Sequence, residues 1–114
     1  MVTIYHNPRC SKSRQTLQLL NDSNINPEVV EYLKTPLNAD ELTNIINMLG
    51  VSVREIIRTS EQDYKDRNLK NPDLSDDELL NAIVEAPKLM QRPIVVNGNK
   101  AAIGRPPEDV LGIL

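Results

Sequence analysis

The N-terminal segment constrains the fold most, because it reads as a strand, a helix and a second strand in close succession. Residues Val2–Tyr5 are β-prone and apolar at alternate positions, and Asn7-Pro8 is typical of a turn. A helix is predicted from Ser11 to the polar run Asp22-Ser23-Asn24, followed by a strand within residues 28–33. The segment between the strands has about the length of a βαβ crossover, which favours parallel pairing with a right-handed connection.

Several short helices are expected next. Asn38 is a candidate N-cap for a helix that Gly50 ends, with apolar residues at helical spacing at Leu42, Ile45, Ile46 and Leu49. Capping-box pairs predict two further helices, one from Ser52 and Glu55 through Ile57 and one from Ser75 and Glu78 to Pro87. Residues 60–63 are consistent with the start of another short helix between these two.

The C-terminal part predicts a hairpin and a last helix. Ile94-Val95-Val96 and Ala101-Ala102-Ile103 flank Asn97-Gly98, a two-residue turn signal, and Pro106-Pro107-Glu108 then begins a helix. The complete order is thioredoxin-like. We therefore expect an α/β domain over residues 1–114, with a mixed four-stranded sheet and a helical insertion between the second strand and the C-terminal hairpin.

Composition excludes several classes of protein. The net charge of −3 gives no sign of nucleic-acid binding, and no long apolar run predicts a signal peptide or a membrane span. A chain with one Cys and one His forms no intrachain disulfide and lacks the usual ligand set for zinc. A reduced, cytoplasmic location without a bound metal or organic cofactor is the simplest interpretation.

Cys10 is the candidate nucleophile. It follows a strand and a turn and opens a helix, where unpaired N–H groups stabilise a thiolate, and Arg9, Lys12 and Arg14 add positive charge. Ser13, one turn on, can donate a hydrogen bond to the sulfur. The alternative is a buried structural cysteine, but the basic, polar neighbours are unlike those of a core position.

The residue three positions after Cys10 is Ser13 and not a second Cys. The chain therefore cannot resolve its own mixed disulfide or sulfenate. Turnover would require a thiol from outside, such as glutathione.

Three arginines and the histidine complete the candidate site. Guanidinium groups of Arg58, Arg92 and Arg105 suit a tetrahedral oxyanion. In a thioredoxin-like fold the segment that holds Arg92 lies beside the active cysteine, and we expect Pro93 there to be cis. Taken one at a time, an arginine is more often a surface residue in a solvated ion pair, which is the alternative for each of the three. His6, four residues before Cys10, is either an acid or base, or a structural residue that orients the loop by hydrogen bonding.

Four ordered segments resemble the thioredoxin-fold arsenate reductases that depend on glutathione and glutaredoxin. They are residues 6–14 (HNPRCSKSR), 50–58 (GVSVREIIR), 92–96 (RPIVV) and 104–106 (GRP), and the resemblance extends over essentially the whole chain. Because Arg9 and Lys12 flank the cysteine region where the best-characterised reductases have small, uncharged residues, the chain looks closer to a chromosomal subgroup of that family.

The resemblance implies a function and a role for each residue. Arg58, Arg92 and Arg105 would hold arsenate, Cys10 would attack arsenic and expel an oxygen as water, and Ser13 and His6 would keep Cys10 deprotonated. Glutathione would then attack the adduct, and glutaredoxin would reduce the mixed species to release arsenite. The same fold leaves two alternatives open: an Spx-type regulator that binds RNA polymerase, and a monothiol oxidoreductase acting on glutathione mixed disulfides.

Overall fold

The computed structural model describes residues 1–114, which form two compact units. The first unit contains residues 1–35 and 92–114, and the second contains residues 36–91. In the sequence, the second unit is therefore an insertion within the first, at the position where the helical insertion is predicted.

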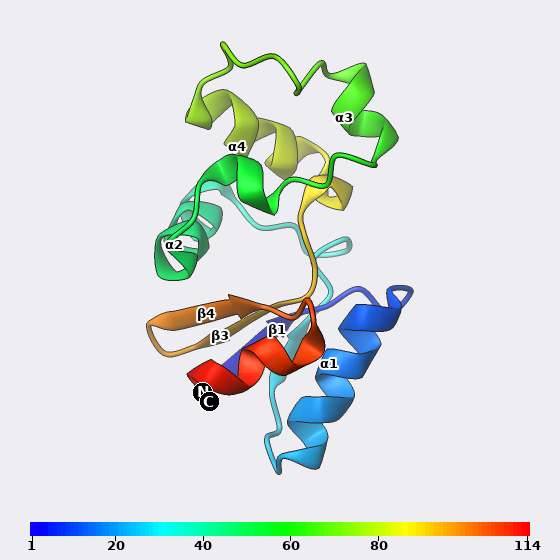
Figure 1. Cartoon of the computed structure of the whole chain (residues 1–114), viewed down its shortest axis with the longest axis vertical. Helices are drawn as coiled ribbons and strands as arrows, with labels where there is room; N and C mark the ends of the chain where they lie inside the picture. The colour runs from blue at the N-terminus through cyan, green and yellow to red at the C-terminus, as the bar shows by residue number, and fades with distance from the viewer. The chain divides into compact units, whose positions relative to one another are not determined.

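The first unit contains a four-stranded mixed sheet (Figure 1), as predicted. The strands are β1 (Val2–Tyr5), β2 (Glu28–Val30), β3 (Ile94–Asn97) and β4 (Lys100–Ile103), in the spatial order β2-β1-β3-β4. β1 pairs parallel with β2 and antiparallel with β3, which pairs antiparallel with β4. The pairing confirms the expected parallel crossover and hairpin, and the architecture is thioredoxin-like.

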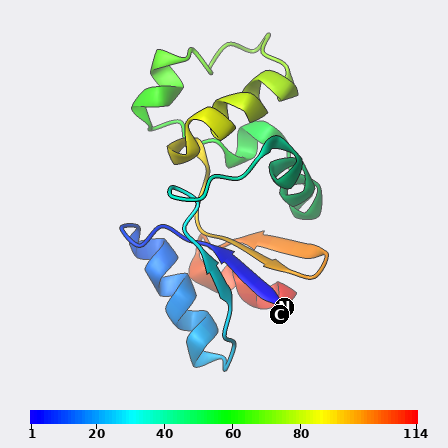
Figure 2. The ribbon, with the colours of Figure 1, turned by 180° about the vertical axis from the view of Figure 1, so that it is seen from behind.

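Two helices pack on this sheet: α1 (Ser11–Asp22) and the C-terminal 3-10 helix η3 (Pro107–Ile113). Ile4 and Val95 are register partners on β1 and β3, and they form a buried cluster with Leu20 of α1 and Val110 of η3. Seen from behind in Figure 2, β1 and β2 lie in front of η3. The aliphatic cluster anchors α1, and with it the loop that precedes this helix.

Two local predictions differ in detail from the structure. The second strand ends at Val30 because the next residues turn, with the N–H groups of Lys34 and Thr35 both donating to the carbonyl of Glu31. Asn97 pairs with Lys100, so the hairpin turn is Gly98-Asn99 and not Asn97-Gly98. Gly98 adopts a φ of +63°, a left-handed conformation that glycine accepts without a steric penalty.

The second unit is helical. It consists of α2 (Ala39–Leu49), η1 (Val53–Ile56), α3 (Gln62–Asp66), α4 (Asp76–Glu85) and η2 (Pro87–Leu89). The predicted capping boxes at Ser52 and Ser75 are present, and the predicted N-cap Asn38 forms a capping box as well. The helix expected through Ile57 is a single 3-10 turn, because Ile57 is extended and forms a β-bridge with Met90.

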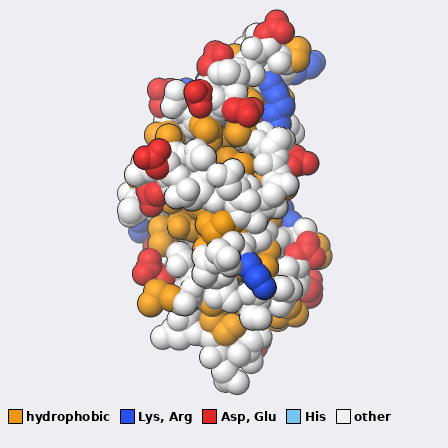
Figure 3. Space-filling model, turned by 90° about the vertical axis from the view of Figure 1, so that its left-hand side faces the viewer, with side chains coloured by type: hydrophobic (Ala, Val, Ile, Leu, Met, Phe, Trp, Pro, Cys, Tyr) orange, Lys and Arg blue, Asp and Glu red, His pale blue; other side chains and the backbone are white.

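The core of the second unit comes from helices α2 and α4, which pack on each other. Its buried aliphatic residues include Leu42, Ile45, Leu79 and Ile83. Figure 3 shows acidic side chains scattered over the face of this unit in the upper half of the view. The first turns of α2 and α4 contribute acidic residues that suit the positive ends of helix dipoles. No helix in the structure is long and apolar enough to cross a membrane.

Candidate functional site

Cys10 is the N-cap of α1, as predicted from the turn before it. Its N–H donates to the carbonyl of Asn7 at 3.0 Å, and its own carbonyl accepts from the N–H of Arg14 at 3.0 Å. The side chain is a free thiol with 9% of its surface exposed. No acidic residue lies in the first turn of α1, so the partial positive charge of the helix start is not offset there.

Arg105 connects the thiol to a distant part of the chain. Its Nη2 lies 3.5 Å from the Sγ of Cys10, and its Nε donates to the carbonyl of Arg92 at 2.7 Å. The structure thus brings the Arg105 guanidinium to both the Cys10 thiol and the backbone of Arg92, within the first unit. The predicted cis peptide at Arg92-Pro93 is confirmed, and a second cis peptide, Arg105-Pro106, was not anticipated from the sequence.

Gly104 is a site residue that lies in the GRP segment (residues 104–106), and the sequence predicted no role for it. A Cβ at this position would lie 2.5 Å from Oγ1 of Thr16 and 2.8 Å from Cγ of Pro93. The N–H of Gly104 donates to the carbonyl of Pro93 at 2.9 Å. Only a residue without a side chain allows α1, Pro93 and the strand end before Arg105 to approach this closely.

Ser13 organises the loop before Cys10. It is fully buried, and its Oγ lies 2.6 Å from Nδ1 of His6 and accepts the N–H of Asn7 at 3.0 Å. The sequence predicted a hydrogen bond from Ser13 to the sulfur, whereas these two partners are the ones that the structure gives its hydroxyl. Asn7 adds a further link, because its Oδ1 accepts the N–H of Arg9 at 3.0 Å.

His6 is buried beneath the same loop. Burial lowers the pKa of His6 below its ordinary value of 6.5; the Glu31 carboxylate raises this pKa in part, and Arg14 lowers it further. At neutral pH the imidazole is therefore mainly neutral. A neutral ring can exchange a proton with the buried Ser13 hydroxyl, or act as its fixed partner.

A cavity of about 210 Å³ adjoins this loop. One side consists of the loop itself, and the other of the turn that follows β2; the lining residues are His6, Asn7, Pro8, Arg9, Glu31, Leu33 and Lys34. The turn residues carried no functional signal in the sequence, because the cavity forms only when β2 pairs with β1.

Arg58 lies in the second unit. Its guanidinium forms an ion pair with Glu61, and its N–H donates to the carbonyl of Leu89 at 2.7 Å. This ion pair agrees with the alternative role of a single arginine, a surface ion pair, although the Arg58 side chain is only 19% exposed.

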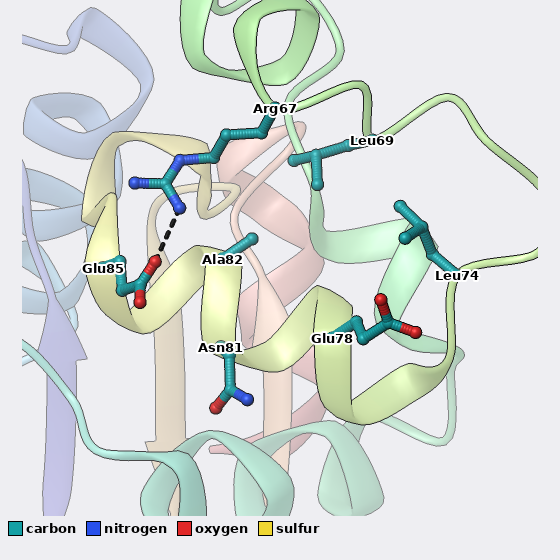
Figure 4. A pocket seen from close by; sticks show the side chains of 7 residues that line it. All are labelled: Arg67, Leu69, Leu74, Glu78, Asn81, Ala82 and Glu85. Carbon is teal, nitrogen blue, oxygen red and sulfur yellow. Dashed lines mark hydrogen bonds and ion pairs between the residues drawn. The ribbon is translucent and has the colours of Figure 1, made fainter.

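The second unit also has a cavity of about 290 Å³ beside α4. Figure 4 shows Arg67 reaching Glu85 across one end of it, whereas Leu74 lies at the other end near Glu78. The ion pair between Arg67 and Glu85 is 2.7 Å long. None of its lining side chains is a thiol or a hydroxyl, so this cavity offers no counterpart to Cys10. No group of three or more His, Cys, Asp or Glu side chains in the structure is placed to hold a metal ion.

Comparison with known proteins agrees with this arrangement. The sequence profile of the ArsC family matches residues 5–113. The chain is 54% identical over 114 residues to "Uncharacterized protein YfgD" of Escherichia coli strain K12, covering 99% of this chain and 96% of that protein. It is 53% identical over 114 residues to "Arsenate reductase" of Haemophilus influenzae, covering 99% and 98% respectively.

A solved structure is similar over almost the whole chain. It is an arsenate reductase from Vibrio cholerae, with a TM-score of 0.98 and 51% sequence identity, covering 99% of this chain and 97% of that one. The family profile spans the Cys10 loop, the Arg92-Pro93 segment and the Gly104-Arg105 segment alike. By its sequence and by the fold that brings these segments together, the chain belongs to the ArsC family.

Proposed function

We propose that this protein is an arsenate reductase in which Cys10 is the nucleophile, with glutathione and glutaredoxin as the source of electrons. The observation that carries the proposal is the 3.5 Å approach of the Arg105 guanidinium to the Cys10 thiol. A cation at this position serves both partners of the reaction, because it stabilises the thiolate and attracts a tetrahedral oxyanion to the same place.

The relatives support arsenate as the oxyanion. Proteins named arsenate reductase in Haemophilus influenzae and Neisseria meningitidis are 53% and 48% identical to this chain over 114 residues. Arg92 and Arg105 supply local positive charge in a protein whose net charge is −3, so long-range attraction does not have to bring the anion in.

The chemistry requires two electrons. The Cys10 thiolate bonds to arsenic, and one oxygen leaves as water after taking up protons; the thiol of glutathione then replaces a second oxygen in the same way. A glutaredoxin thiolate attacks the glutathione sulfur, so that a disulfide forms, the arsenic–sulfur bond breaks and its electron pair stays on arsenic. Water finally displaces Cys10 from arsenic(III) and releases arsenite.

The requirement for outside thiols follows from the cysteine content. Cys10 is the only cysteine, so no second thiol of this chain can complete the reduction. A reducing cytoplasm supplies such thiols, and we place the protein there. Ser13 and His6 support the reaction by holding the loop that presents Cys10, through the contacts of Ser13 Oγ with His6 and Asn7.

The test is a coupled assay of arsenate reduction with glutathione and glutaredoxin, in which arsenite is measured directly. The wild-type protein should release arsenite, and omission of either thiol source should stop the reaction. Cys10→Ser should show no turnover, and Ser11→Ala, which alters the next side chain of the helix, should stay active. If the wild-type protein reduces glutathione mixed disulfides but no arsenate, it is a monothiol oxidoreductase. If it reduces no arsenate but binds RNA polymerase in a pull-down, it is a regulator of the Spx type.

A further inference from the structure

The cavity of about 210 Å³ beside the Cys10 loop has no part in holding arsenate in the proposed reaction. It lies where the parallel strands β1 and β2 both end, and the N–H of His6 joins the two segments by donating to the carbonyl of Val30 at 2.8 Å. The carboxyl ends of parallel strands are a common place for ligands in α/β sheets. The location therefore suits a second ligand of the same active site.

The charges on this cavity form a pattern. Arg9 contributes an exposed guanidinium with no hydrogen-bond or ion-pair partner in the structure, and Lys34 contributes an exposed ammonium. Glu31 contributes the one carboxylate, and its contact with Lys34 is 3.6 Å long. Such an exposed pair stabilises little, so a ligand can take over either partner at small cost. Pro8 and Leu33 add apolar surface between the charges.

This pattern of two cations and one anion is complementary to an amino-acid end group, which carries a carboxylate and an ammonium group. His6 does not change the balance, because its imidazole is mainly neutral at pH 7. The cavity volume excludes a folded protein and suits a group of a few heavy atoms, such as one end of a small peptide.

The cavity is also within reach of the thiol. Arg9 lines it and directly precedes Cys10, and consecutive Cα atoms lie about 3.8 Å apart. An extended tripeptide spans roughly 10 Å. A peptide with its charged end in the cavity can therefore present a thiol from its central residue to Cys10.

We propose that this cavity is a subsite beside Cys10 that binds the charged amino-acid end of the external, glutathione-type thiol. Arg9 and Lys34 bind the carboxylate of that end, and Glu31 binds its ammonium group. The inference rests on the proposed function for the statement that Cys10 reacts with an outside thiol of the glutathione type. This subsite gives a function to the charged residues Arg9, Glu31 and Lys34 beside the Cys10 loop. They are separate from Arg105, the proposed ligand of the oxyanion.

The experiment measures recognition without arsenate. Reduced protein is mixed with glutathione disulfide, and intact mass follows the exchange in which the Cys10 thiolate bonds to one glutathione sulfur, the disulfide bond breaks and a glutathione thiolate leaves. The same exchange with hydroxyethyl disulfide, which carries no charge, reports the reactivity of Cys10 alone. The measured quantity is the ratio of the two rates.

Three variants distinguish a specific binding site for glutathione from non-specific electrostatic attraction of the anionic disulfide. Arg9→Gln should lower the ratio about fivefold, the upper range for an exposed ion pair. Glu31→Gln should also lower it, by about twofold or more, since the ammonium loses its partner. Lys100→Gln removes the same charge as Arg9→Gln on the distant hairpin and should leave the ratio unchanged.

The result for Glu31→Gln decides between the two explanations. Loss of a carboxylate makes the cavity more positive, so simple attraction of an anionic disulfide predicts a higher ratio. A rise with Glu31→Gln, or no fall with Arg9→Gln, would overturn the subsite. Because the exchange contains no arsenate, a protein that fails to reduce arsenate can still support or refute this inference.

Discussion

The guanidinium of Arg105 lies against the sulfur of Cys10, with Nη2 3.5 Å from Sγ, although 94 residues separate the two in the chain. The same guanidinium uses its Nε to hold the carbonyl of Arg92 at 2.7 Å. One side chain therefore fixes the position of the peptide before cis-Pro93 and places a permanent cation on the candidate nucleophile.

Replacement of Arg105 should damage catalysis more than folding. Arg105→Ala should lower kcat for arsenate reduction about a hundredfold, because a preorganised donor to developing negative charge is lost. Arg105→Lys should recover part of this loss, since an ammonium keeps the charge but not the planar fork. Steady-state kinetics of arsenite release measure both effects.

Thermal unfolding provides the control for Arg105. The side chain is exposed, so the Tm of Arg105→Ala should stay close to that of the wild type. A fully active Arg105→Ala protein would show that the contact with Cys10 has no catalytic role.

Gly104 should tolerate no side chain. Gly104→Ala places a Cβ 2.5 Å from Oγ1 of Thr16 and 2.8 Å from Cγ of Pro93, and Thr16 is fully buried. Overpacking of this kind costs about 1–3 kcal/mol of unfolding free energy. Urea denaturation measures the change.

Gly112→Ala is the matched control for Gly104, because a Cβ at Gly112 would meet no atom within 4 Å. Its unfolding free energy should differ from that of the wild type by no more than about 0.5 kcal/mol. Equal stability of the two alanine variants would refute the claim that close packing requires glycine at position 104.

Ser13 should matter for stability as well as activity. Ser13→Ala leaves the N–H of Asn7 and the Nδ1 of His6 without their buried partner, which costs about 1–3 kcal/mol. Ser11→Ala, at the exposed first position of the same helix, should change stability by less than about 0.5 kcal/mol. If the two variants unfold at the same urea concentration, the hydroxyl of Ser13 is not a structural partner of the loop.

His6 is the only histidine, so its imidazole protons give one NMR titration curve. The midpoint should lie below 6.5, because burial lowers the pKa of His6. Glu31→Gln should move the midpoint lower still, since the carboxylate raises this pKa, and Arg14→Gln should move it higher. A midpoint at or above 6.5 in the wild-type protein contradicts the buried, neutral imidazole.

The same shift affects stability in a defined pH window. An unfolded chain binds a proton at His6 near pH 6.5, whereas the native protein binds it only at lower pH. The His6 contribution is therefore complete above 6.5 and decreases as the pH falls toward the native pKa, below which it is constant. In urea denaturation between pH 8 and pH 5, His6→Asn should lack this component of the pH dependence.

Local sequence signals were sufficient for most elements of the fold. The capping boxes at Ser52 and Ser75, the N-cap Asn38 and the helix end at Gly50 depend on side chains and backbone within a few residues, and all are present as predicted. The single cysteine at a helix start was likewise readable from its neighbours. Such features need no knowledge of distant contacts, because the hydrogen bonds that define them close within one turn.

Tertiary structure decided what depends on residues far apart in the chain. The contact between Arg105 and Cys10, the close approach of Gly104 to Thr16, and the cavity between the Cys10 loop and Glu31 arise only when β1 pairs with β2 and β3. Strand β2 ends at Val30 because the following residues form a turn whose N–H groups donate to the carbonyl of Glu31. The β-propensity of the sequence does not indicate this turn. The sequence by itself determined which groups carry the chemistry, and packing of the strands and α1 determined which of them meet, because side-chain distances across a sheet depend on strand order and register.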